Sequence, residues 1–140
     1  MIVCQNGRKG EIRMNIIIDI IPHSEQRYNT VGDWFYDDED RQLVIRVSET
    51  GNEYQNFLLI IHELIEAVLC KQKGITQGQV DNWDLSHQEY TEPGEIRECP
   101  YFIPHFIAAT IERGLAHELE INWEKYEDIL DLLMLERKDK

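Results

Sequence analysis

Residues 57–70 read FLLIIHELIEAVLC, an apolar run that is interrupted only by His62, Glu63 and Glu66. Ionisable side chains are rarely buried in such a run unless a partner or a metal ion compensates them. On a helix, residues 62 and 66 lie on one face, one turn apart. Two side chains of ligand type at this spacing indicate a shared ion, with Glu63 beside them as a general base.

Three segments before residue 50 have the composition of β-strands. Residues 16–21, 33–36 and 43–47 are rich in β-branched or aromatic side chains, and Pro22 ends the first of them. The third segment partly alternates apolar and polar residues, which is typical of a half-buried strand. We therefore expect a small N-terminal antiparallel sheet.

The sequence after residue 50 has a helical pattern. A central helix is predicted over about residues 53–73, between the N-cap Asn52 and the helix stop Gly74. Three further helices are predicted: a short one opened by a capping box at Thr76, one from Pro104 to about Leu119, and one that follows the cap Asn122. The expected fold class is α+β, with the sheet packed on a four-helix C-terminal part.

The first 13 residues differ from the rest of the chain. They lack periodicity, and Met14 stands directly before the first predicted strand. The residues KGE at 9–11 resemble a translated ribosome-binding site upstream of Met14. We expect a disordered leader over residues 1–13 and a single domain over residues 14–140.

Charge, cysteine content and hydropathy indicate which binding partners and which cellular compartment to expect. The formal net charge is −13, which argues against phosphate contacts with nucleic acid and against anionic membranes. Three cysteines at scattered positions suggest neither a disulfide framework nor a zinc knuckle, so a reducing cytosol is expected. No apolar stretch is long enough to span a membrane, and no signal peptide is visible.

A second pair of ligand-type residues lies on the third predicted helix. His105 and Glu112 are seven residues apart, and small alanines on the same face would allow this helix to approach the first closely. We expect His62, Glu66 and His105 to bind zinc or another divalent ion, with Glu112 as a fourth ligand or as a partner that fixes an imidazole. The alternative is that residues 62 and 66 bind no metal and are simply buried, with hydrogen bonds to Arg113 or to a backbone group.

Other ionisable residues have two interpretations each. Asp81, Asp84 and His87 on the short helix are either further ligands or a solvated face. His23 begins a loop that either closes over a pocket or forms a structural turn with Arg27 paired to an acid. For the short helix we favour the solvated face, and for the loop we favour the structural turn.

Several segments together resemble a family of small uncharacterised proteins of bacteriophages and prophages, over roughly residues 14–126. They are IPHSEQRY at 21–28, GDW at 32–34, IRVS at 45–48, HELIEA at 62–67, GI at 74–75, VD at 80–81 with Asp84, EPG at 92–94, PY at 100–101 with His105, and IER at 111–113. The resemblance implies action in the cytosol of a bacterial host and implies no particular activity. A more distant similarity to zincin-type metalloproteases rests on His62-Glu63 and on the order of strand before helix. The chain departs from the HExxH pattern of those enzymes at Glu66.

Three functions are compatible with these residues. The first is a metal-dependent hydrolase of peptide or amide bonds, in which Glu63 takes a proton from water. The second is a magnesium-dependent nucleotide pyrophosphatase, suggested by the carboxylates of residues 63, 66 and 112, although histidines suit magnesium poorly. The third is a non-enzymatic phage accessory protein that binds a host protein and holds a structural metal ion or none.

Overall fold

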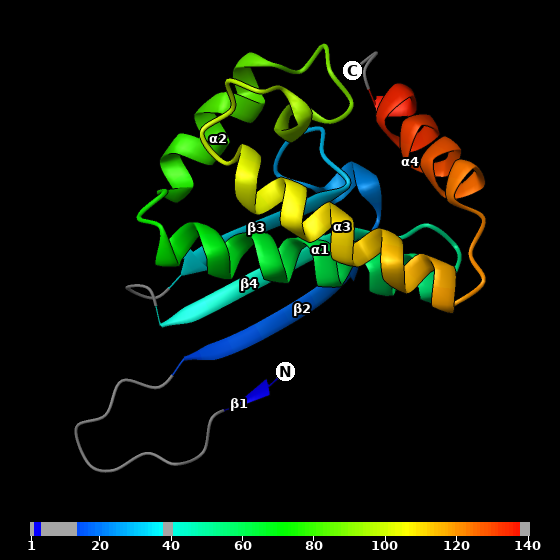
Figure 1. The fold of residues 1–140 in the computed structure, drawn as a ribbon, viewed down its shortest axis with the longest axis horizontal. Helices are drawn as coiled ribbons and strands as arrows, with labels where there is room; N and C mark the ends of the chain where they lie inside the picture. The colour runs from blue at the N-terminus through cyan, green and yellow to red at the C-terminus, as the bar shows by residue number, and fades with distance from the viewer. Residues whose placement is uncertain (1, 4–13, 38–40, 138–140) are drawn as a thin grey trace.

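The computed structural model of the protein describes residues 2–3, 14–37 and 41–137. A sheet at the N-terminus precedes four helices, which confirms the predicted α+β class (Figure 1). The helices are α1 (Glu53–Gln72), α2 (Gln77–Ser86), α3 (Phe102–Glu118) and α4 (Trp123–Arg137), with 3-10 turns η1 (His23–Glu25) and η2 (Pro93–Glu95). Of the predicted leader, the structure describes β1 (Ile2–Val3), which pairs with the next strand, and residues 1 and 4–13 lie outside the described part.

The sheet has the strand order β1-β2-β4-β3, with β2 at Asn15–Ile21, β3 at Gly32–Asp37 and β4 at Gln42–Ser48. β3 runs antiparallel to β4, as predicted, but β2 runs parallel to β4, so the expected antiparallel sheet is mixed. The reason is the connection over residues 22–31, which is long enough to skip one strand position. β4 then returns into the gap between β2 and β3.

α1 is the central helix of the domain. It lies on one face of the sheet against β3 and β4, and α3 packs along its other side (Figure 1). Leu43, Ile45 and Val47 of β4 are almost fully buried in one apolar core with Leu58 and Leu59 of α1. Because α1 is covered by the sheet on one side and by α3 on the other, its ionisable residues can be buried.

The helix ends follow the predicted signals. The Asn52 side chain accepts hydrogen bonds from two backbone N–H groups of the first turn of α1, and Gly74 has φ +72° just after the helix. Thr76 and Gln79 form the predicted capping box of α2. No helix in the described part of the chain has both the length and the apolar content needed to cross a membrane.

Candidate metal centre

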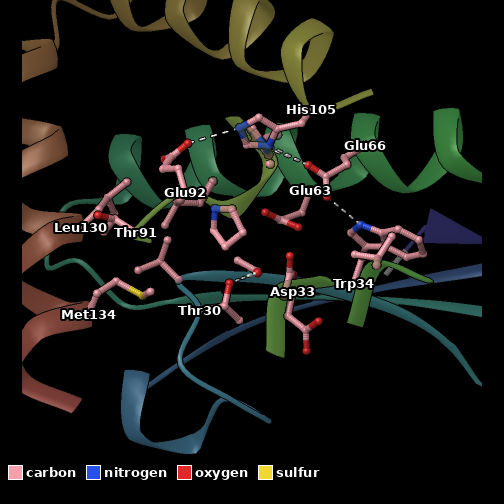
Figure 2. Close-up of a pocket in the computed structure, with 18 of the residues that line it drawn as sticks. Thr30, Asp33, Trp34, Glu63, Glu66, Thr91, Glu92, His105, Leu130 and Met134 are labelled. Carbon is pink, nitrogen blue, oxygen red and sulfur yellow. Dashed lines mark hydrogen bonds and ion pairs between the residues drawn. The ribbon is translucent and has the colours of Figure 1, made fainter. Parts of the chain in front are cut away.

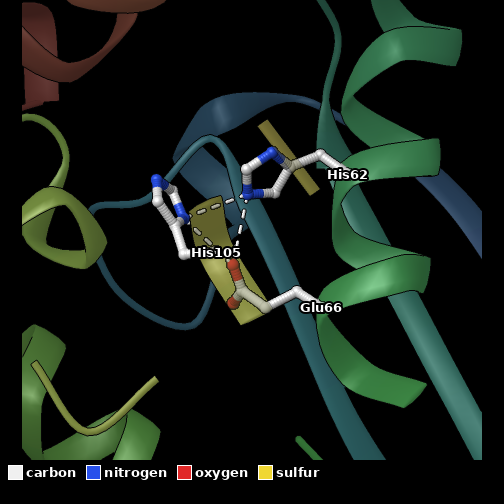
Figure 3. A group of neighbouring side chains, drawn as sticks. All are labelled: His62, Glu66 and His105. Carbon is white, nitrogen blue, oxygen red and sulfur yellow. Dashed lines mark hydrogen bonds and ion pairs between the residues drawn. The ribbon is translucent and has the colours of Figure 1, made fainter. Parts of the chain in front are cut away.

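α1 and α3 bring three potential ligand atoms together (Figure 3). His62 Nε2, Glu66 Oε2 and His105 Nδ1 form a triangle in which every side is 3.1 Å. All three side chains are buried, and they form a group that could hold a metal ion. The residues predicted from spacing alone therefore point at a common position.

The backbone geometry explains this convergence. Residues 62 and 66 share one face of α1, and α3 runs antiparallel to it, so Glu66 meets His105 while His62 meets Glu112 two turns further along α3. Ala108 lies between these two positions on α3 and is completely buried. A small side chain there lets the two helices approach closely enough for histidine and glutamate to touch.

Glu112 lies behind the imidazole of His62 rather than among the converging atoms. Its Oε1 accepts the Nδ1–H of His62 at 2.7 Å, and its Oε2 accepts the hydroxyl of Tyr126 at 2.6 Å. This is the second of the two roles predicted for Glu112, and it does not support a role as direct ligand. A carboxylate on the outer nitrogen fixes the tautomer and orientation of a ligating imidazole.

The other two residues of the triangle are also held from outside. The indole Nε1–H of Trp34 donates to Glu66 Oε1 at 3.1 Å, and Glu92 Oε2 lies 3.3 Å from His105 Nε2. Gly94 contacts the ring of His105 so closely that a Cβ there would lie 2.6 Å from its Cγ. Glycine at this position thus allows the η2 turn to pack directly on the imidazole.

The donor set fits a zinc ion. Two imidazoles and one carboxylate are ligands used by catalytic zinc sites, which leave the fourth position free. Ligand atoms around a tetrahedral zinc with bonds of about 2.0–2.1 Å lie about 3.3 Å apart, close to the separations of the triangle. Because Glu112 accepts the Nδ1–H of His62, Nε2 is the nitrogen that would bind an ion, in place of the proton that it shares with Glu66.

Protons compete with a metal ion for the three ligand atoms of the triangle. Burial lowers the pKa of His62, but the carboxylates of Glu112 and Glu66 outweigh it and raise that pKa well above its ordinary value. Burial would raise the pKa of Glu66, yet hydrogen bonds from His105 and His62 bring it to about 2. The electrostatics of the cluster therefore favour positive charge at its centre, supplied by protons or by a metal ion.

A pocket of about 70 Å³ opens beside the triangle, and the carboxylate of Glu63 points into it (Figure 2). Glu63 is 9% exposed and has no hydrogen-bond partner among the described residues. Burial and the neighbouring Glu66 raise its pKa well above the ordinary value. Its side chain packs on the edge strand at Gly32, where a Cβ would lie 2.2 Å from Glu63 Oε1. Such a carboxyl group is suited to accepting and releasing a proton.

Of the residues considered on α2, only Asp84 is buried in this pocket. It accepts hydrogen bonds from the hydroxyls of Tyr28 and Tyr101. Asp81 instead forms an ion pair with Arg27, and His87 stacks on Trp83 at the surface. Asp84 is therefore a lining residue of the pocket and not part of the ligand triangle.

In the loop after β2, His23 and Arg27 have the structural roles of the favoured interpretation, whereas residues 28–31 line the pocket, as the other interpretation proposed for the loop. Arg27 binds both oxygens of Asp33, at 2.8 and 2.9 Å. His23 lies outside the pocket and contacts Ser48 and Asn29. Arg113, the alternative partner proposed for residues 62 and 66, instead packs over the ring of Trp123.

Four supporting residues were not found by sequence reasoning: Trp34, Glu92, Tyr101 and Tyr126. Tyr126 has the spacing of the apolar face of α4, so its hydroxyl gives no separate signal in the sequence. The others lie in a strand and in an irregular loop, so their contacts depend on tertiary packing and have no sequence period.

Asp84 leads to a prediction about pH. Burial raises its pKa to about 7, although both tyrosine hydroxyls act in the opposite direction. Because this exceeds the unfolded value of about 3.9, the folded state keeps the proton to higher pH, so the stability that Asp84 contributes should fall between about pH 4 and pH 7 and level off above that. Between about pH 5 and pH 8, the free energy of unfolding should fall by about 2–4 kcal/mol more in the wild type than in Asp84→Asn, as measured by urea unfolding. Asp128→Asn, at an exposed acid, controls for net charge; an unchanged slope in Asp84→Asn would contradict the assignment.

No protein-family model, curated protein or solved structure matches this chain. The resemblance to phage proteins and the distant similarity to zincins therefore stay predictions from the motifs.

Proposed function

We propose that the protein is a metal-dependent hydrolase, with peptide or amide bonds as the favoured substrates. The observation that carries the proposal is the triangle of His62 Nε2, Glu66 Oε2 and His105 Nδ1 at 3.1 Å, which lies at a pocket that also contains Glu63. Zinc is the favoured ion because two of the three donors are imidazole nitrogens.

Each residue has a distinct task in this proposal. A divalent ion held by the triangle would supply Lewis acidity toward a scissile carbonyl and toward water. Glu63 accepts the proton of the attacking water on its carboxylate and returns it to the leaving nitrogen. Glu112 and Tyr126 keep His62 oriented, and Trp34 does the same for Glu66.

Metal content after zinc loading and dialysis tests the proposal. The wild-type chain should retain one zinc per molecule, and His62→Ala, Glu66→Ala and His105→Ala should retain almost none. His117→Ala is the matched control, because this histidine lies on α3 but is exposed. A wild-type chain that retains no zinc and whose melting temperature is unaffected by chelation would remove the proposal. Loss of zinc that unfolds the domain would instead indicate a structural ion.

The two alternatives have less support. A nucleotide pyrophosphatase must compensate several phosphate charges, but no lysine or arginine is among the described residues that line the pocket. Magnesium-dependent release of pyrophosphate from nucleotides would favour it nevertheless. A non-enzymatic accessory protein that binds a host protein has no need for an unpaired carboxylate such as Glu63 beside the ligands. If the phage resemblance holds, the substrate is found in the cytosol of a bacterium.

A further inference from the structure

The pocket of the candidate metal centre continues toward the surface beside α4. A second hollow adjoins it, and the two share Asn29, Gln88, Thr91 and Met134 as lining residues. Figure 2 shows Thr91 and Met134 on the α4 side of the pocket, with Trp34 at the opposite side. A substrate at the metal centre can therefore extend one of its side chains between α4 and the segment that follows α2.

The outer hollow combines apolar walls with one carboxylate. Tyr90 and Leu135 line it, and they are 48% and 62% exposed, so their apolar surface is open to a ligand. Asp131 of α4 is its only acidic lining residue among those described. Apolar walls with a single acid suit a side chain that has an aliphatic stem and a cationic end.

The electrostatics favour a cation at this position. Asp131 has no ion-pair partner among the described residues. Asp131 is exposed at the mouth of the hollow, and slight burial with the nearby carboxylates of Glu92 and Asp128 raises its pKa. No lysine or arginine is among the described lining residues of either hollow. An anionic side chain would be repelled, whereas an ammonium or guanidinium group would be attracted.

We propose that the outer hollow binds a lysine or arginine side chain of a polypeptide substrate, with the charged end beside Asp131 and the stem between Tyr90 and Leu135. The proposal rests on the proposed function in treating the pocket as a substrate site. It adds a substrate class, peptides with a basic residue near the scissile bond. The ring of Tyr90 adds a cation–π surface for the same group.

Calorimetric titration of the full-length, metal-free protein tests this inference without a measurement of activity. The probes are the peptide amides acetyl-Ala-Ala-Lys-Ala-Ala-NH2 and its norleucine and glutamate counterparts. The lysine peptide should bind about three- to tenfold more tightly than the norleucine peptide, and the glutamate peptide more weakly than both. The preference should shrink between about 50 mM and 500 mM salt, because exposed charges are screened.

The variant Asp131→Asn should bind the lysine and norleucine peptides equally. Glu124→Gln removes the same charge from the first turn of α4, outside both hollows, and should keep the preference. Equal binding of all three peptides, no binding of any, or a lysine preference that survives Asp131→Asn would overturn the inference. A lysine preference in a protein that retains no zinc would overturn the hydrolase proposal alone, since the titration uses metal-free protein.

Discussion

Replacing Glu63 by glutamine is expected to lower hydrolysis by about 10²–10⁴-fold while zinc content stays the same. Glutamine has the size of glutamate but cannot accept the proton of an attacking water. None of the three converging ligand atoms belongs to Glu63, so the metal site should be unaffected. The measurement is turnover of an internally quenched peptide library by the zinc-loaded protein, with metal content determined on the same samples.

The stability of Glu63→Gln separates a chemical effect from a folding effect. Glu63 is buried near the like-charged Glu66, so removing its charge should leave the free energy of unfolding unchanged or higher. The matched control is Glu118→Gln, an exposed acid at the end of α3. Undiminished turnover in Glu63→Gln would show that another group takes the proton, and a large loss of zinc would show that Glu63 contributes to the metal site.

Periodicity explains why much of the site could be predicted from the sequence. Residues 62 and 66 are one helical turn apart, and residues 105 and 112 are two turns apart, so each pair had to share a face. The small alanines on the face of the second pair then indicated which face of α3 meets α1, and Ala108 is indeed buried there. These spacings are local regularities of a helix, and the N-cap Asn52 marks where α1 begins.

The remaining contacts depend on long-range packing that no local pattern encodes. The parallel pairing of β2 with β4 depends on how the connection over residues 22–31 passes over the sheet. Trp34 reaches Glu66 only because β3 is the edge strand next to α1. Gly94 and Glu92 belong to an irregular loop, whose sequence indicates a turn but not the ring against which the turn packs.

Removing the imidazole of His62 should have the largest effect on stability. It lies between two buried carboxylates, with Nδ1 at 2.7 Å from Glu112 and Nε2 at 3.1 Å from Glu66. Breaking a buried pair by removing one partner leaves the other charge uncompensated, which costs about 3–5 kcal/mol. We therefore expect His62→Ala to lose about that much unfolding free energy in the presence of a chelator, measured by urea denaturation.

A double-mutant cycle identifies the origin of that loss. If the cost comes from the orphaned carboxylate, then His62→Ala combined with Glu112→Gln should be less destabilised than the sum of the two single variants. Glutamine at position 112 can still accept the hydroxyl of Tyr126, so the outer hydrogen bond is retained. Strictly additive losses would mean that His62 and Glu112 do not stabilise each other in the folded protein. The orientation of the proposed zinc ligand would then have to come from the packing of α1 against α3 alone.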